Sequence, residues 1–359
     1  MWHDRRLLDL FGIEHPILLA PMAGAMDATL AAAVAQAGGL GSLPAAMLDA
    51  TKLRDHVVAF RAAAPGKPIN LNFFSHTAPV PNNAREHGWR EALKPYYEEF
   101  GIDPNAPVPA SNRAPFDEAF CLVVEELKPE VVSFHYGLPA AGLVARVKAA
   151  GAKIISSATT VAEAVYLDEH GCDAVIAQGF EAGGHRGMFL SGDLANQIGT
   201  FALVPLIADA VKVPVIAAGG VTDARGIVAA MALGAAGVQI GSGYLHSPES
   251  KVAAPHRTLL RSARGREMAV TNVMTGRPAR GFINRVMRDL GPISAIAPAF
   301  PLAGGAIAPL GAQAQAQGSG DFSSMWAGQA VALGRELPAR DLTLALVREA
   351  QDLMRGRAG

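Results

Sequence analysis

The sequence has few cysteines and almost no net charge, and each of these shortages excludes a class of protein. Only two cysteines occur in 359 residues, Cys121 and Cys172, and they lack CxxC spacing. We therefore expect reduced thiols in the core of a cytoplasmic protein, not a disulfide framework. A formal net charge of −1 gives no electrostatic reason to expect nucleic acid or an anionic membrane as a partner.

Long apolar runs, metal-ligand clusters and the best-known nucleotide motifs are also missing. No apolar run reaches the roughly 18–20 residues needed to span a bilayer, and the N-terminus does not read as a signal peptide. No His, Cys and Asp cluster has metal-ligand spacing, so we expect no metal. No GxGxxG follows the first strand-like run and no Walker A sequence occurs, which argues against Rossmann dinucleotide and NTP sites.

What the sequence does contain is a repeated alternation of short apolar β-runs with Ala-rich amphipathic segments. Eight β-runs are expected at 16–22, 39–44, 68–74, 131–137, 153–159, 173–178, 214–220 and 237–243. Helices are expected near 27–37, 50–63, 115–127, 140–149, 161–170, 200–211 and 223–233. Eight βα units predict an α/β fold of the (β/α)8 TIM-barrel type. A doubly wound open sheet is the alternative, because a sequence does not show whether a sheet closes.

Two stretches interrupt this alternation. Residues 76–114 hold six prolines and a charged helical piece at 85–100, and residues 245–320 separate the eighth β-run from any final barrel helix. We expect a barrel domain formed by 1–244 plus 321–359, and a smaller substrate or lid domain formed by 245–320.

The C-terminal part of the chain combines a low-complexity tract with two expected helices. The low-complexity tract at 311–318 is expected to be a mobile surface connection. The eighth barrel helix is expected at 321–335, followed by an amphipathic C-terminal helix at 338–356. Apolar helix faces cannot be assigned to core or interface, so both a monomer and a homodimer fit the sequence.

The most informative stretch is QGFEAGGHRG at 178–187, directly after the sixth β-run. Gln178 can donate and accept hydrogen bonds toward a planar heterocycle, and Gly183 and Gly184 let the backbone approach a ligand closely. His185 adds a titratable ring. Arg186 adds a permanent charge that could bind a substrate carboxylate or lie in a surface ion pair.

Glycines also follow the seventh and eighth β-runs, where TIM barrels commonly hold phosphate. Gly219 and Gly220 end one run, and the other ends in Gln239-Ile240-Gly241-Ser242. Their backbone N–H groups can surround a phosphate, and Ser242 adds a hydroxyl donor. The simpler interpretation of either turn alone is that its glycines only reverse the chain.

Polar or soft side chains end three further β-runs. The first ends in Ala20-Pro21-Met22, whose backbone and thioether can lie along an apolar ring. Asn72 ends the third run on the same strand face as Asn70, for which a structural hydrogen bond is equally expected. His135 ends the fourth and is a second candidate imidazole. Together these groups predict a site for a flat, phosphorylated cofactor.

These motifs resemble those of the class I nitronate monooxygenases, FMN enzymes formerly called 2-nitropropane dioxygenases. The resemblance covers essentially the whole chain, and the 178–187 motif is its most specific part. It also includes APMAG at 20–24, NFFSH at 72–76, SFHYG at 133–137, VIAAGG at 215–220, GVQIG at 237–241 and SSMWAGQ at 323–329. Ser242 is a small departure, since the family often has Thr there.

The resemblance implies an FMN held by Asn72, Gln178, Gly183, Gly220 and the run from Gln239 to Ser242. We expect Ala20, Pro21, Met22, Gly184 and Gly219 to complete that site.

The implied reaction is oxidation of an alkyl nitronate, such as propionate 3-nitronate, by O2 after one-electron transfer to the flavin. His185 matches the family's active-site histidine, and His135 is a secondary catalytic candidate. We expect His185, with an ordinary pKa of roughly 6.5, to be partly cationic and to position the anionic substrate. With a neutral nitroalkane the same ring could act as a base.

Two other functions fit the same residues. One is an NAD(P)H-dependent FMN reductase of quinones or enoyl thioesters, and the other is a barrel that only stores or senses FMN.

Overall fold

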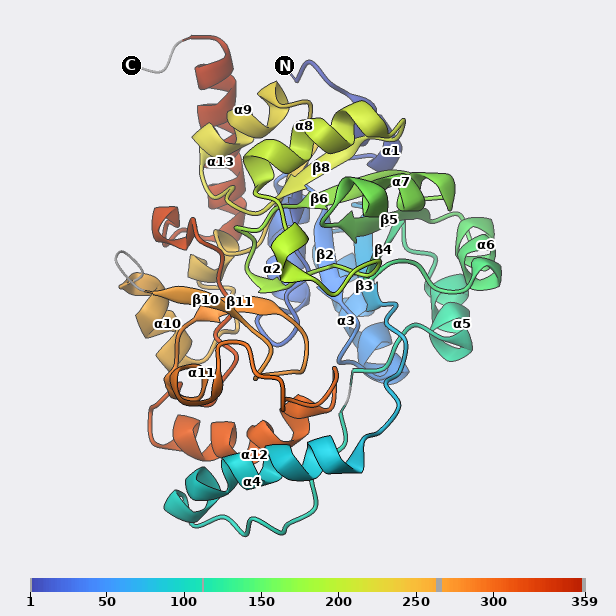
Figure 1. The fold of residues 1–359 in the computed structure, drawn as a ribbon. Coiled ribbons are helices and arrows are strands. Elements are labelled where there is room, and N and C mark those ends of the chain that lie inside the picture. Colours follow the sequence, from blue (N-terminus) through green and yellow to red (C-terminus); the bar gives the residue numbers. More distant parts are fainter. Residues whose placement is uncertain (1, 112, 263–266, 357–359) are drawn as a thin grey trace.

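Eight parallel strands form a closed barrel in the computed structural model, which describes residues 2–111, 113–262 and 267–356 (Figure 1). The strands are β1 (Ile17–Leu19), β2 (Gly41–Pro44), β3 (Ile69–Phe74), β4 (Val131–His135), β5 (Lys153–Ala158), β6 (Ala174–Gln178), β8 (Val215–Ala218) and β9 (Gly237–Ile240). They are arranged in the order β1-β9-β8-β6-β5-β4-β3-β2. A parallel bridge between Leu18 and Leu40 joins the two ends of that order. The predicted TIM barrel is therefore confirmed, and the open sheet is excluded.

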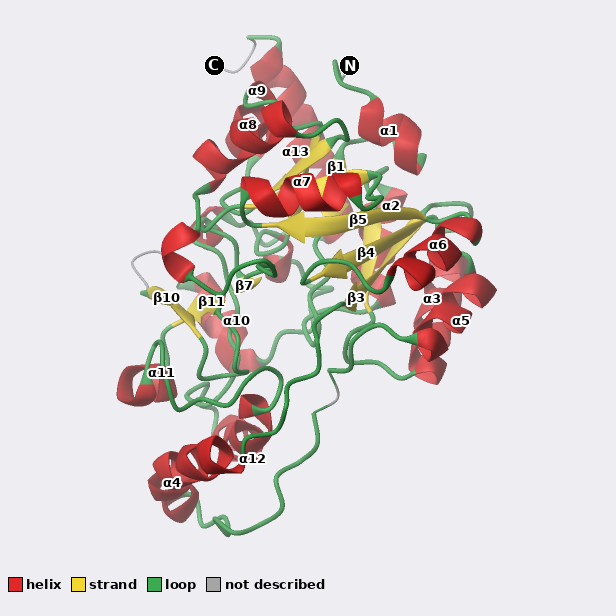
Figure 2. Ribbon diagram, turned by 45° about the vertical axis from the view of Figure 1, so that its right-hand side comes forward, coloured by secondary structure: helices red, strands yellow, loops and turns green. Residues whose placement is uncertain are grey.

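Helices surround the strands (Figure 2). They are α1 (Arg6–Phe11), α2 (Ala28–Gln36), α3 (Ala50–Ala63), α5 (Glu118–Leu127), α6 (Ala141–Ala149), α7 (Val161–Glu169), α8 (Thr200–Ala210), α9 (Ala224–Ala232) and α13 (Ala339–Met354). Five of them begin at an Asp or Thr whose side chain accepts a hydrogen bond from a backbone N–H of the first turn. Cys121 and Cys172 are free and buried, as the sequence predicts.

The eighth barrel helix is α13, so the helix expected at 321–335 is wrong. That segment is irregular apart from the short 3-10 turn η3 (Val331–Leu333). Its backbone bonds to another strand instead: Phe282 N donates to Met325 O at 3.0 Å, and Ala327 N donates to Arg280 O at 3.3 Å. Helix α13 packs against α2 and α9 and completes the ring.

Elements from both interruptions of the barrel pattern lie beside the barrel. They are α4 (Asn83–Glu99), η2 (Tyr244–His246), α10 (Ala254–Arg261), β10 (Met268–Thr271), β11 (Ala279–Phe282), α11 (Arg285–Leu290) and α12 (Ala303–Ala316). Helices α4 and α12 run side by side (Figures 1 and 2). Residues 112 and 263–266, which fall within these interruptions, lie outside the described residues. The division of the chain into two domains stays a prediction.

The tract at 311–318 was expected to be mobile, but its first six residues complete α12. Alanine and glutamine favour helix, and Gly311 and Ala314 are buried. Trp89 of α4 is 1% exposed, and its indole N–H donates to Ala303 O at 3.2 Å. Tyr97 of α4 donates to Ala306 O at 2.6 Å. Helix α12 therefore packs on α4 through its first turns, and Ala314 of the tract is buried in the same hydrophobic cluster as Trp89.

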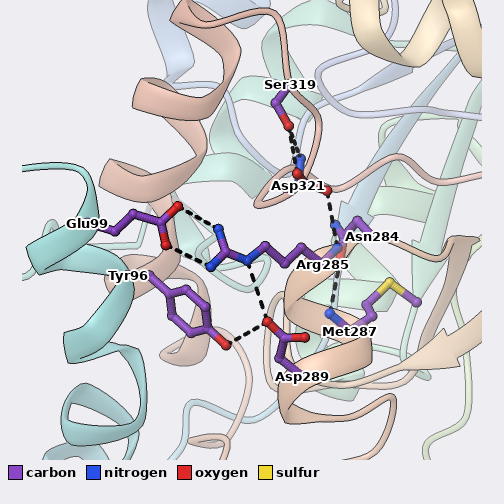
Figure 3. A network of polar contacts seen from close by, with 8 residues as sticks. All are labelled: Tyr96, Glu99, Asn284, Arg285, Met287, Asp289, Ser319 and Asp321. Carbon is purple, nitrogen blue, oxygen red and sulfur yellow. Dashed lines mark hydrogen bonds and ion pairs between the residues drawn. The ribbon is translucent and has the colours of Figure 1, made fainter.

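A polar network ties α4 to α11 (Figure 3). Arg285 makes two hydrogen bonds of 2.7 Å to the Glu99 carboxylate. Tyr96 donates to Asp289 at 2.9 Å, and Arg285 Nε lies 3.6 Å from the same carboxylate. The two interruptions thus pack as one unit.

A short antiparallel sheet connects this unit to the barrel. Its order is β10-β11-β7, and β7 (Gly184–His185) belongs to the loop after β6. Ala279 pairs with His185 and Arg280 with Gly184. Strand β11 therefore fixes the backbone of the 178–187 motif at Gly184 and His185.

Candidate active site

A cavity of about 630 Å³ opens at the carboxyl ends of the barrel strands. Most of the predicted site residues line it: Ala20, Pro21, Met22, Asn72, His135, Gln178, Gly183, Gly184, His185, Gly219, Gly220, Gln239, Gly241 and Ser242. Ile240 is the exception, because its side chain is fully buried in the barrel core. Its carbonyl accepts a hydrogen bond from Ala20 N at 2.9 Å.

Two glycine-rich turns follow the barrel strands: Gly219–Gly220 after β8, and Gly241–Ser242 after β9. We call them the glycine corners. They are neighbours, because β8 and β9 pair directly. Gly219 and Gly220 have φ values of +104° and +73°, which favour glycine. A Cβ on Gly219 would lie 2.8 Å from Ala182 N, so this turn also needs a small residue to pack against the β6 loop. The Ser242 hydroxyl accepts a hydrogen bond from Gly328 N at 2.8 Å. It therefore ties segment 323–329 to the β9 corner.

The side-chain amides of Asn72 and Gln239 differ in how far the protein satisfies their hydrogen bonds. Asn72 Nδ2 donates to Ser133 Oγ at 2.9 Å. Gln239 Oε1 is buried without a partner among the described residues. A buried unpaired acceptor is costly, so a donor on a ligand would satisfy Gln239. Asn70 has a structural role, because its amide donates to Ser42 Oγ at 3.0 Å in the barrel interior.

Gln178 and Arg186 hold the shape of the 178–187 loop. Gln178 donates to His185 O at 2.9 Å and accepts from Gly187 N at 2.7 Å. Arg186 is fully buried and donates to Gly179 O, Gln178 O and Gln197 Oε1 at 2.6–2.9 Å. Burial lowers the Arg186 pKa to about 9. Both expectations for Arg186 are wrong: it neither faces the cavity nor lies in a surface ion pair.

His185 projects from β7 into an aromatic enclosure. Its ring lies 5.4 Å from Phe300 and 5.5 Å from Trp326, and its Nε2 is 2.9 Å from Thr275 Oγ1. Burial, followed by the charge of Arg113, lowers the pKa of His185 well below its ordinary value. The neutral imidazole is therefore favoured, in contrast to the partly cationic ring that the sequence suggested.

His135 contacts the 178–187 loop from the end of β4. Its Nδ1 lies 3.1 Å from Ser157 Oγ and its Nε2 3.1 Å from His185 O, so both ring nitrogens have partners. Burial lowers its pKa to about 4. A Cβ on Gly187 would lie 2.9 Å from the His135 ring, which explains a glycine at that position. These contacts favour a positioning role over proton transfer.

Sequence reasoning missed four residues at the site. Arg113 lines the cavity and comes from the irregular 76–114 interruption. Thr275 and Phe300 contact His185 from segments without periodicity. Trp326 belongs to the SSMWAGQ motif, which was the only signal that could have identified any of these contacts.

The cavity fits a planar, phosphorylated cofactor such as the flavin that the sequence resemblance implies. Its volume is within the usual range of roughly 300–1,000 Å³ for ligand pockets. Adjacent glycine corners offer backbone N–H groups to a phosphoryl group, and Gln239 offers an unpaired acceptor.

The described part of the chain lacks metal-type side-chain clusters and long apolar helices. It contains no group of three or more His, Cys, Asp or Glu residues that could hold a metal ion. None of its helices is long and apolar enough to cross a bilayer.

Comparison with known proteins gives a consistent result. The family model for nitronate monooxygenase matches residues 4–349. The nitronate monooxygenase of Pseudomonas aeruginosa is 43% identical over 350 residues, which cover 96% of this chain and 98% of that protein. The one from Paraburkholderia phytofirmans is 41% identical over 348 residues, which cover 96% and 94%. A crystal structure of nitroalkane oxidase from Streptomyces ansochromogenes superposes with a TM-score of 0.88 at 34% identity and covers 98% of this chain and 100% of that one. The chain belongs to the nitronate monooxygenase family.

Proposed function

We propose that this protein is an FMN-dependent monooxygenase that oxidises alkyl nitronates of the propionate 3-nitronate type with O2. The products are a carbonyl compound and nitrite or nitrate. One observation carries the proposal: His185 and the two glycine corners line a single cavity. Relatives named nitronate monooxygenase align with nearly the full chain and support the same reaction.

The chain's own residues would hold the cofactor in parts. Backbone N–H groups at Gly220 and Gly241, with Ser242, would bind the phosphoryl group. Gln239 and Asn72 would bind polar edges of the ring, and Met22 would lie along its apolar surface. When bound, FMN supplies an acceptor for one electron from the nitronate and a donor of electrons to O2.

His185, with its imidazole neutral, would position the substrate. A nitronate has already lost its α-proton, so its oxidation needs no base. Thr275 Oγ1 would orient the imidazole through Nε2, and the rings of Phe300 and Trp326 pack against it. With a neutral nitroalkane, the unprotonated ring could accept the α-proton.

An oxygen-electrode assay tests the proposed function. The purified yellow protein should consume O2 when propionate 3-nitronate is added without any nicotinamide. No O2 uptake would contradict the proposal. A protein that only stored flavin would show that result.

The cofactor and the reductase alternative are tested separately. Chromatography of the released flavin should show FMN, and FAD would contradict the assignment of the glycine corners. NADH or NADPH mixed anaerobically with the enzyme should bleach the flavin slowly or not at all. Rapid bleaching would favour the reductase, which has weaker support because the similar full-length relatives are named for nitronates.

A further inference from the structure

The cavity has one permanently charged side chain among the described residues that line it. That residue is Arg113, and the same set contains no Asp, Glu or Lys. A flavin and a nitronate both bring negative charge into this cavity. The glycine corners account for the phosphoryl charge at the β8 and β9 ends, but Arg113 comes from a different part of the chain and is not needed there.

Arg113 has no counter-ion among the described residues. No described carboxylate lies within ion-pair distance of its guanidinium, and no described residue accepts a hydrogen bond from its side chain. Burial lowers the Arg113 pKa, and the Tyr136 phenol opposes this shift. A partly buried arginine without an acceptor is unfavourable unless a ligand supplies one.

Arg113 also lies close to the N-terminus of helix α12, which is an unfavourable place for an unpaired cation. Its Nη1 lies 3.9 Å from the place that a Cβ would occupy on Gly304, in the first turn of α12. Leu302 at the N-cap of α12 supplies no capping side chain. A helix N-terminus carries partial positive charge, so a cation is disfavoured there and an anion is favoured. An anion bound by Arg113 would relieve both effects.

The surroundings of His185 are positive as well. Arg277 lies over the Tyr136 ring with its guanidinium carbon 4.0 Å from the centroid. The Tyr136 hydroxyl and His76 Nδ1 are buried and have no partner among the described residues. Tyr136 and His185 are neighbours, with ring centroids 6.3 Å apart. This side of the cavity therefore carries a second guanidinium, that of Arg277, and no carboxylate among the described residues that line the cavity.

We infer that Arg113 binds a carboxylate at the end of the substrate remote from the nitronate carbon, and that it selects nitronates carrying this second negative group. This inference rests on the proposed function, because it assigns the part of the nitronate substrate that does not react. The guanidinium can form paired, charge-assisted hydrogen bonds with a carboxylate, which an alkyl group cannot provide.

The test compares two nitronates of equal chain length. We expect wild-type enzyme to have a higher kcat/KM for propionate 3-nitronate than for propyl-1-nitronate, which lacks the carboxylate. In Arg113→Met the ratio of these two kcat/KM values should fall about tenfold or more, mainly through KM for the carboxylated substrate. Arg113→Lys should restore part of the ratio. Arg85→Met, which removes an exposed charge from α4 in the same interruption, should keep the wild-type ratio.

A binding measurement separates this inference from the proposed reaction. Propionate should perturb the absorbance of the bound flavin, with a Kd about tenfold or more weaker in Arg113→Met than in wild type. If nitronate turnover is absent but this difference is found, the anion site stands and the proposed reaction fails. Equal loss for both nitronates, an unchanged ratio, or equal propionate affinity in flavin-replete variants would overturn the inference.

Discussion

At the scale of a single residue, burial decides what His185 can do. The ring is enclosed by Phe300 and Trp326 and faces the positive charge of Arg113, so protonation is disfavoured at neutral pH. Its contribution is then geometry and hydrogen bonding. His185→Asn keeps a polar group on the same backbone, so we expect the variant to retain flavin while kcat/KM for nitronate falls about tenfold or more. Steady-state O2 uptake measures this, and unchanged kinetics would remove His185 from the mechanism.

Arg186 is a charged side chain that stabilises the fold and does not face the cavity. All three of its hydrogen-bond acceptors belong to the protein, and two are backbone carbonyls of the 178–187 loop. Arg186→Met should lower the free energy of unfolding by about 2–4 kcal/mol, because those carbonyls lose charge-assisted bonds. Urea denaturation measures the change. Arg225→Met, at an exposed arginine, is the matched control and should change little. Equal effects of the two substitutions would contradict the structural role of Arg186.

At the scale of the elements, the barrel could be predicted because its signals are local. Apolar β-runs, capping residues and glycines after helices each depend on a few neighbouring positions. The C-terminal part shows where that stops. Residues 311–316 belong to α12, whose first turns bond to α4, more than 200 residues away in the chain. Segment 321–335 lost its expected helix to pairing with β11. Arg113 could not be placed at the site, because no periodicity orients it.

The packing of α4 on α12 gives a prediction at this scale. Trp89 is almost fully buried and bonds to the first residue of α12, while the Arg285–Glu99 pair in Figure 3 is solvent-exposed. Trp89→Ala should therefore lower the free energy of unfolding by about 3–5 kcal/mol, through a cavity and a lost hydrogen bond. Glu99→Gln should have a much smaller effect, because exposed ion pairs contribute little. Urea denaturation of both variants checks the order, and the reverse order would show that the ion pair holds the unit together.

At the scale of the whole molecule, several buried histidines couple stability to pH. Burial lowers the pKa of His76, His135 and His256 to about 4, whereas an unfolded histidine has a pKa of roughly 6.5. Between these values the unfolded chain binds more protons than the folded one. Stability is therefore fully present above about pH 6.5 and is lost as the pH falls toward about 4. Each histidine contributes at most about 1.4 kcal/mol per pH unit in that window.

The urea midpoint at pH 7, 6 and 5 measures this coupling. We expect the midpoint of the wild-type protein to fall steadily over that range. His256→Gln removes one buried imidazole, so its midpoint should fall less steeply, because one fewer proton is taken up on unfolding. His87→Gln, at an exposed histidine of α4, should keep the wild-type slope. Identical slopes in all three proteins would mean that the pKa of His256 is the same in the folded and unfolded states, which its apolar neighbour Phe282 and an Nε2 without a partner among the described residues argue against.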